Sequence, residues 1–81
     1  MKVTVLFFAQ VRERAGRASA ELSLPEGSRV ADALTAVAGE HPALEPLWPQ
    51  LAVAVSGRLA RPDTPLSAGA EIALLPPVSG G

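Results

Sequence analysis

Residues 19–39 read SAELSLPEGSRVADALTAVAG, and this stretch carries the signals of a strand, a turn and a helix in direct succession. In its first part, Ser19–Leu24, polar residues occupy every second position, which predicts a strand with one buried face. The next four residues, Pro25–Ser28, have the composition of a turn. Ser28 is a good N-cap residue, so we expect the helix to begin there.

The predicted helix has one apolar face. Its apolar residues recur at i, i+4, i+7 and i+8, namely Val30, Leu34, Val37 and Ala38. Asp32 lies in the first turn, near the positive end of the helix dipole. Gly39 is expected to end the helix by adopting the left-handed conformation. Since a lone helix cannot leave its apolar face in water, we expect it to pack across a sheet.

A second strand is predicted near the start of the chain. Val3–Phe8, VTVLFF, is rich in β-branched and aromatic residues. Because side chains alternate along a strand, the residues of this one divide into two faces, with Val3, Val5 and Phe7 on one and Thr4, Leu6 and Phe8 on the other. Thr4 indicates that the second face is turned away from the helix. Residues 9–18, AQVRERAGRA, contain Gly16 and four charges, which favours a loop between two antiparallel strands.

The segment after the helix is expected to be an ordered connection followed by a hairpin. Glu40–Gln50 contains three prolines, which exclude a long regular helix but allow a single turn around Leu44–Trp48. Leu51–Ala60 has two apolar runs separated by Ser56 and Gly57, a pattern typical of a β-hairpin.

A final strand completes the predicted fold. Glu71–Leu75, EIALL, has strand character, and Pro76 ends its pairing because proline has no N–H to donate. The order strand, strand, helix, strand, short strand, strand predicts a two-layer α+β fold, a mixed sheet with one main helix packed across it. We therefore expect one domain over residues 1–75 and an extended tail over residues 76–81.

Composition excludes several classes of function. The chain has 81 residues, which is one domain, and a formal net charge of −1, without the basic excess of a nucleic-acid-binding or membrane-surface protein. No apolar stretch reaches membrane-spanning length and no signal-peptide cleavage site follows the first residues, so a cytoplasmic location is expected. The absence of cysteine excludes disulfides, thiolate metal sites and a cysteine nucleophile.

Few side chains are candidates for catalysis. His41 is the only histidine and is expected to be an exposed loop residue, since no catalytic set can be assembled around it. The glutamates lack metal-ligand spacing and the glycines form no P-loop, so we expect neither a metal site nor ATP binding by this chain. Arg12 belongs to a charged cluster that is either a solvated loop or a docking site for a partner. Trp48 is interpreted as a core residue.

The C-terminal residues are the strongest functional signal from the residues themselves. They read Pro76, Pro77, Val78, Ser79, Gly80 and Gly81. One interpretation is a frayed terminus. The alternative is a functional arm, because the two prolines favour an extended direction and the two glycines form a thread without Cβ atoms. From Pro77 to Gly81 such a thread reaches roughly 16 Å at about 3.3 Å per residue and presents an unhindered α-carboxylate.

Two motifs at opposite ends of the chain resemble a known family. LFFAQVRE (Leu6–Glu13) together with PPVSGG (Pro76–Gly81) is similar to the small subunits of molybdopterin synthase, which are β-grasp, ubiquitin-like sulfur carriers. The resemblance implies a β-grasp fold. It also implies that an ATP-dependent activating enzyme adenylates the Gly81 carboxylate, and that a sulfur donor protein then supplies the sulfur of a thiocarboxylate.

The resemblance further implies a partner protein. The tail, including Gly80, would enter the large subunit of molybdopterin synthase within a heterotetramer, where sulfur passes to cyclic pyranopterin monophosphate to form molybdopterin. The chain would then have no catalytic group of its own and no bound cofactor, and the carried group would be the thiocarboxylate.

A partner-binding face is expected beside the tail. Alternation along the first and last strands places Phe8 and Leu75 on one exposed face if Leu75 points outward, and the resemblance adds Leu59. Arg12 of the charged cluster is the further candidate for a partner contact. The alternative is that Phe8, Leu59 and Leu75 fill the core. Two other functions also stay open, namely a related carrier for thiamine synthesis or tRNA thiolation, and a modifier that forms isopeptide bonds with target lysines.

Overall fold

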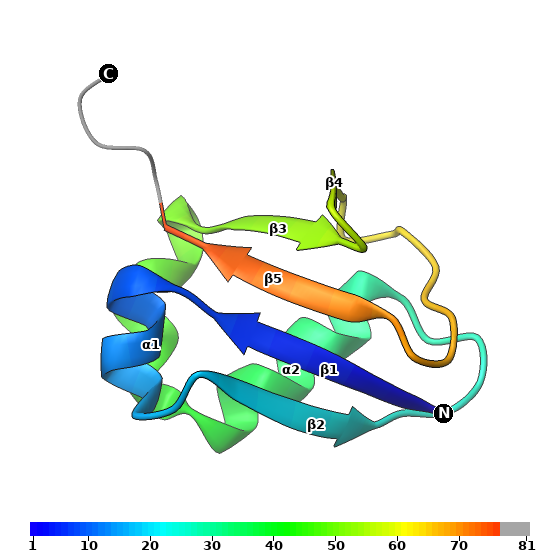
Figure 1. Ribbon diagram of the computed structural model, residues 1–81, viewed down its shortest axis with the longest axis horizontal. Coiled ribbons are helices and arrows are strands. Elements are labelled where there is room, and N and C mark those ends of the chain that lie inside the picture. Colours follow the sequence, from blue (N-terminus) through cyan, green and yellow to red (C-terminus); the bar gives the residue numbers. More distant parts are fainter. Residues whose placement is uncertain (77–81) are drawn as a thin grey trace.

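The computed structural model describes residues 1–76, which form a five-stranded sheet backed by helical segments (Figure 1). The elements in chain order are β1 (Lys2–Phe7), α1 (Ala9–Ala15), β2 (Ser19–Ser23), α2 (Val30–Glu40), η1 (Pro42–Gln50, a 3-10 helix), β3 (Ala52–Val55), β4 (Arg58–Leu59) and β5 (Glu71–Leu75). The strand order is β2-β1-β5-β3-β4, with β1 and β5 parallel and the other neighbours antiparallel. With α2 packed across this mixed sheet, the structure confirms the predicted α+β class and the β-grasp arrangement.

The core lies between the sheet and α2. Alternate residues of β1, namely Val3, Val5 and Phe7, are buried, as are Ile72 and Leu74 of β5. The helix contributes Val30, Ala33 and Val37 to the same cluster. The prediction that Thr4 marks the face turned away from the helix is therefore confirmed.

The ends of α2 differ from the prediction by one or two residues. Arg29, not Ser28, is the N-cap residue, and its backbone N–H donates to Oδ2 of Asp32 at 2.8 Å. The Ser28 hydroxyl donates instead to the carbonyl of Pro25 at 2.7 Å, which closes the preceding turn. The helix also continues through Gly39 to Glu40, so Gly39 is not its stop.

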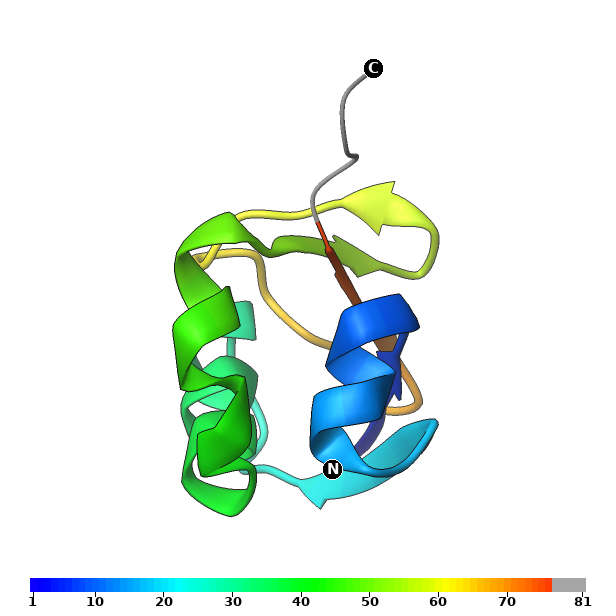
Figure 2. The same cartoon turned by 90° about the vertical axis from the view of Figure 1, so that its left-hand side faces the viewer.

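The connection between β1 and β2 is a helix, and its prediction as a loop was wrong. The residues of α1 include good helix formers, and Val11 on its inner side is fully buried. Gly16 ends the helix with φ of 75°, the left-handed conformation that glycine adopts without strain. Figure 1 shows α1 at the end of the sheet and α2 behind it, and in Figure 2 α2 is seen beyond η1, which contacts α1.

The proline-rich connection forms a nine-residue 3-10 helix, which is longer than the single turn predicted. Its Leu44 is fully buried, and Trp48 is half-buried against the core, in part as expected. His41 joins α2 to η1 and is half-buried, since its ring packs edge-on against Phe7 with centroids 5.3 Å apart. Its place in a connection was therefore predicted correctly, whereas its expected exposure was wrong.

The second hairpin and the last strand agree with the sequence analysis. β3 and β4 pair around Ser56 and Gly57, whose φ values of 49° and 84° suit a tight hairpin turn. β5 spans Glu71–Leu75 as predicted. Within residues 1–76 no helix has the length and apolar character needed to cross a membrane.

Candidate functional site

The face of the sheet turned away from α2, here called the outer face, carries an apolar row across four strands. Strand pairing places Leu6 next to Ala73, Ala73 next to Ala54, and Ala54 next to Leu59. Residues paired in this way point to the same face. Leu59 is 79% exposed although it is a large apolar residue.

A second apolar row lies one step closer to the C-terminal segment. Phe7 pairs with Leu74, and Phe8 keeps an extended backbone (φ −118°, ψ 149°), so the Phe8 side chain points outward beside Leu75. Leu75 in turn pairs with Ala52 of β3. Phe8 is 44% exposed and Leu75 is half-buried.

Together the two rows form the outer apolar patch. Its residues are Leu6, Phe8, Ala52, Ala54, Leu59, Ala73 and Leu75. Toward the other end of the sheet the outer face becomes charged, because Thr4 pairs with Glu21 on one side and with Glu71 on the other. β1 and β5 both run from this charged end to the apolar end, so the apolar patch lies where β5 leads into Pro76.

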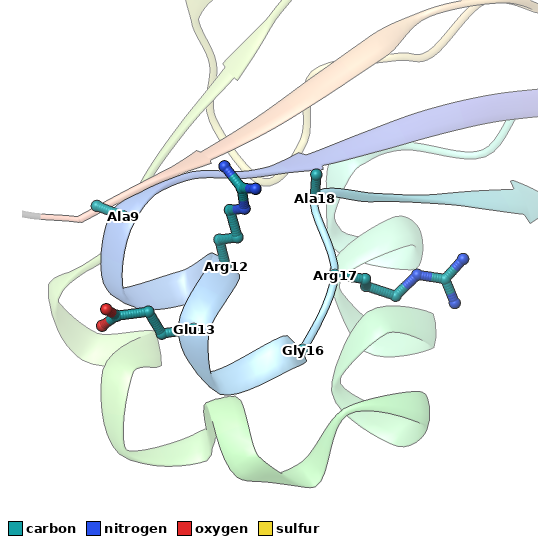
Figure 3. A pocket seen from close by; sticks show the side chains of 6 residues that line it. All are labelled: Ala9, Arg12, Glu13, Gly16, Arg17 and Ala18. Atoms are coloured by element: carbon teal, nitrogen blue, oxygen red, sulfur yellow. The ribbon is translucent and has the colours of Figure 1, made fainter.

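Arg12 lies on α1, beside the outer apolar patch. It is exposed and follows Phe8 by one helical turn, with its backbone N–H 3.3 Å from the Phe8 carbonyl oxygen. Arg12 and Arg17 line a shallow hollow of about 510 Å³ between α1 and the start of β2. In Figure 3 the Arg12 side chain extends toward the strands, whereas Glu13 points away from both arginines.

The remaining predicted site residues are placed as follows. Pro76 is half-buried at the end of β5. Pro77, Val78, Ser79, Gly80 and Gly81 lie outside the described residues. Within residues 1–76 no three His, Cys, Asp or Glu side chains are grouped so that they could hold a metal ion.

The structure adds Ala52 and Ala54, which the sequence analysis did not place on this face, and it fixes the neighbours of Leu6 and Ala73. Leu6, Ala52, Ala54 and Ala73 join the patch because of the pairing of β5 with β1 and β3. Alternation alone put Leu6 on the side of Phe8, but no local signal gives the register between strands that are distant in sequence.

The sequence model of the ThiS family matches residues 5–81. The chain belongs to this family. It is therefore a sulfur carrier of the ubiquitin-like fold, and the family match includes the C-terminal glycines.

The relatives fall into two groups, sulfur carrier subunits of molybdopterin synthase and a small archaeal modifier protein. The chain is 35% identical over 83 residues to a molybdopterin synthase sulfur carrier subunit from Chlamydomonas reinhardtii, with all of both chains covered. It is 38% identical over 82 residues to small archaeal modifier protein 1 from Haloferax volcanii, with 91% of this chain and 94% of the relative covered.

The similar solved structures also include both an archaeal modifier and a molybdopterin-converting factor. A crystal structure of the Haloferax volcanii modifier superposes with a TM-score of 0.91 at 34% identity, covering 100% of both chains. A complex of subunits 1 and 2 of molybdopterin-converting factor from Helicobacter pylori contains a chain that matches with a TM-score of 0.74 at 29% identity, again with 100% of both chains covered. This relative has therefore been seen bound to a second subunit.

Proposed function

We propose that this chain is the sulfur-carrying small subunit of molybdopterin synthase. Its reactive group is the α-carboxylate of Gly81, at the end of a tail formed by residues 76–81 beyond a domain of residues 1–75. An activating enzyme joins this carboxylate to AMP and releases pyrophosphate from ATP. A donor protein then delivers sulfur at the oxidation level of sulfide, which attacks the acyl carbon, so that the bond to AMP breaks and the products are AMP and a thiocarboxylate.

The large subunit of the synthase receives the loaded tail. The terminal C–S bond breaks as sulfur is transferred to cyclic pyranopterin monophosphate, and water restores the carboxylate for another cycle. The domain positions the tail and requires no general base or metal ion of its own. A cytoplasmic location is expected, because adenylation requires ATP.

One observation carries this proposal, namely the outer apolar patch at the root of the tail. Phe8 and Leu59 are the large apolar side chains that the described residues leave exposed, at 44% and 79%. Full burial of one such side chain is worth about 1.5–3 kcal/mol, so a partner that covers both gains a large share of a typical binding free energy. A partner held there is also next to the point where the tail begins.

The relatives favour the large subunit as this partner. The Helicobacter pylori relative is in a complex with subunit 2 of its converting factor, and this chain matches that relative over its full length. We expect a heterotetramer of two small and two large subunits. Arg12 follows Phe8 by one helical turn, and we expect its charge to meet an acidic group of the partner beside the patch.

The second candidate function is protein modification. It is favoured by the 38% identity to the Haloferax volcanii modifier and by the TM-score of 0.91 with its crystal structure. Activation of Gly81 would be the same, but a lysine amine of a target would displace AMP and form an isopeptide bond. A carrier for thiamine synthesis or tRNA thiolation would also share the first step.

Reconstitution distinguishes these functions. The protein is converted to its thiocarboxylate, mixed with the large subunit from the same organism, and supplied with cyclic pyranopterin monophosphate. We expect formation of molybdopterin and return of the carboxylate, measured by intact mass. Failure of this reaction, with a ladder of lysine conjugates in cells, would favour the modifier. A deletion strain that lacks thiamine or thiolated tRNA but keeps molybdoenzyme activity would favour the other carriers.

A further inference from the structure

An apolar groove lies at the β3–β4 edge of the molecule, next to the outer face of the sheet. It has a volume of about 440 Å³, and all of its nine lining residues are apolar. Its walls include Leu34, Trp48, Leu51, Val53, Leu59 and Pro62. The chain has one tryptophan, and it is in this groove.

The groove is open because the sheet ends there. β4 is the edge strand and has only two residues, which pair with Ala54 and Val55, so among residues 1–76 no strand lies beside Ala52 on that edge of β3. Trp48 comes from the last turn of η1, where its carbonyl accepts the N–H of Leu51 at 3.2 Å. The groove is thus formed by η1, α2, the β3–β4 hairpin and the loop that follows β4.

Backbone hydrogen bonds fix the far wall. The loop after β4 returns to the start of α2, where the N–H of Ala31 donates to the Pro62 carbonyl at 2.8 Å and the N–H of Val30 donates to the Thr64 carbonyl at 2.9 Å. Figure 2 shows this loop passing from the hairpin back to the helical side of the molecule. The wall that contains Pro62 is therefore held in place before any ligand binds.

The groove is continuous with the outer apolar patch. Leu59 lines the groove and also pairs with Ala54 on the outer face. Ala52 lines the groove and pairs with Leu75 at the root of the tail. An apolar surface therefore runs from the outer face around the β3–β4 edge to Trp48.

We propose that this groove is a second contact for the large subunit, which places an uncharged apolar segment over the β3–β4 edge and against Trp48. The inference rests on the proposed function, since the same partner must cover the outer patch. An apolar occupant follows from the lining, which offers no charged group to pair with a charged side chain. The shared residues Leu59 and Ala52 make the two contacts parts of one interface.

Trp48 reports directly on the groove. The chain is labelled with 5-fluorotryptophan, so that its single fluorine signal is followed by NMR while the unlabelled large subunit is added. Gel filtration of the same samples shows whether the complex forms. A soluble nitroxide measures how accessible the fluorine is to solvent. We expect a shifted fluorine signal and at least a several-fold drop in nitroxide relaxation in the complex.

The outcomes separate the inference from the proposed function. A complex in which the signal and its accessibility stay unchanged would overturn the groove contact and leave the proposed function intact. Absence of any complex would overturn both. A shift that depends on the concentration of the labelled chain alone would assign the groove to a second copy, and protection by the activating enzyme but not the large subunit would assign it to that enzyme. Either result overturns this inference.

A matched pair of variants gives an independent measurement. Ala60→Asp places a charge in the groove, whereas Ala68→Asp places the same charge in an exposed turn. We expect Ala60→Asp to weaken the complex about tenfold or more and Ala68→Asp to leave it unchanged. Equal affinities of the two folded variants would contradict the proposal. Should Ala60→Asp fail to fold, the fluorine measurement on the unsubstituted chain decides.

Discussion

The inner and outer faces of the sheet are made by the same strands, yet only the inner one is covered. Phe7 is 2% exposed beneath the helical layer, whereas its neighbour Phe8 is 44% exposed on the other face. Both faces of β1 are apolar near its C-terminal end, so hydrophobicity alone does not distinguish core from surface. The difference comes from what lies above each face, and the open apolar face is the one next to the C-terminal segment.

Removal of Gly81 should have the largest effect on function and almost none on either face. The variant loses the terminal carboxylate that the activating enzyme recognises, while residues 1–76 keep all their contacts. We expect no detectable sulfur transfer, with unchanged melting temperature and with binding to the large subunit retained. Thiocarboxylate formation is measured by intact mass and turnover by molybdopterin formation.

Lengthening the tail tests whether the reactive carbon must lie at a fixed distance from the domain. One residue added after Gly81 moves the reactive carbon by about 3.5 Å, which places it beyond the partner's reacting groups. Full activity of the shortened or the lengthened variant would show that the chemistry does not reside on Gly81.

Phe7 and Phe8 provide the sharpest test of the two faces, because the substitution is the same at adjacent positions. Phe7→Ala should lower the free energy of unfolding by about 3–5 kcal/mol, since it opens a cavity in the core. Phe8→Ala should cost less than about 1 kcal/mol of stability but weaken binding to the large subunit about tenfold or more. Chemical denaturation and titration calorimetry measure the two quantities.

The assignment of Phe7 to the core and Phe8 to the partner contact would be contradicted if Phe8→Ala lowered stability and left binding unchanged. If Phe8→Ala unfolds at clearly lower denaturant concentration and binds normally, Phe8 belongs to the core. A small domain has only about 5–15 kcal/mol of stability, so Phe7→Leu is the milder version of the same loss to be measured should Phe7→Ala leave too little folded protein.

Leu74 and Leu75 repeat this test on the last strand with smaller expected effects. Leu74 is fully buried, so Leu74→Ala should cost about 2–5 kcal/mol of stability. Leu75 is half-buried, so Leu75→Ala should cost less stability and should weaken the complex about fivefold, as expected for a residue at the margin of a contact. A stability loss at Leu75 as large as at Leu74, with normal binding, would place both in the core.

The elements that the sequence predicted well are those with strong local patterns. β5 was predicted at its observed limits, and the alternation in β1 assigned Val3, Val5 and Phe7 to the inner face. α1 was missed because a seven-residue helix with a single buried residue, Val11, has too little periodicity to outweigh its charges.

The site depended more on contacts between distant parts of the chain. Phe8 was placed on the outer face by alternation alone. The position of Leu59 required either a family resemblance or the pairing with Ala54, because a two-residue strand has no pattern of its own. The groove around Trp48 could not be predicted at all, since it is formed by two helices, a hairpin and a loop whose arrangement no local signal encodes.

Arg12 should give the smallest effect, because it lies at the margin of the outer apolar patch and is exposed. Charge pairs at such margins are worth about 0.2–1 kcal/mol, so Arg12→Ala should weaken the complex no more than about fivefold at low salt. The loss should appear mainly in the association rate and should shrink as salt is added.

Arg14 is the control for this prediction, since it has the same charge on the same helix but faces η1, where its guanidinium lies 3.5 Å from the carbonyl oxygen of Ala43. Arg14→Ala should leave the association rate with the large subunit unchanged at every salt concentration. Equal effects of the two substitutions would mean that the partner senses only the net charge of α1. No effect of either would make Arg12 a solvated surface residue, and the contact would then consist of the apolar face alone.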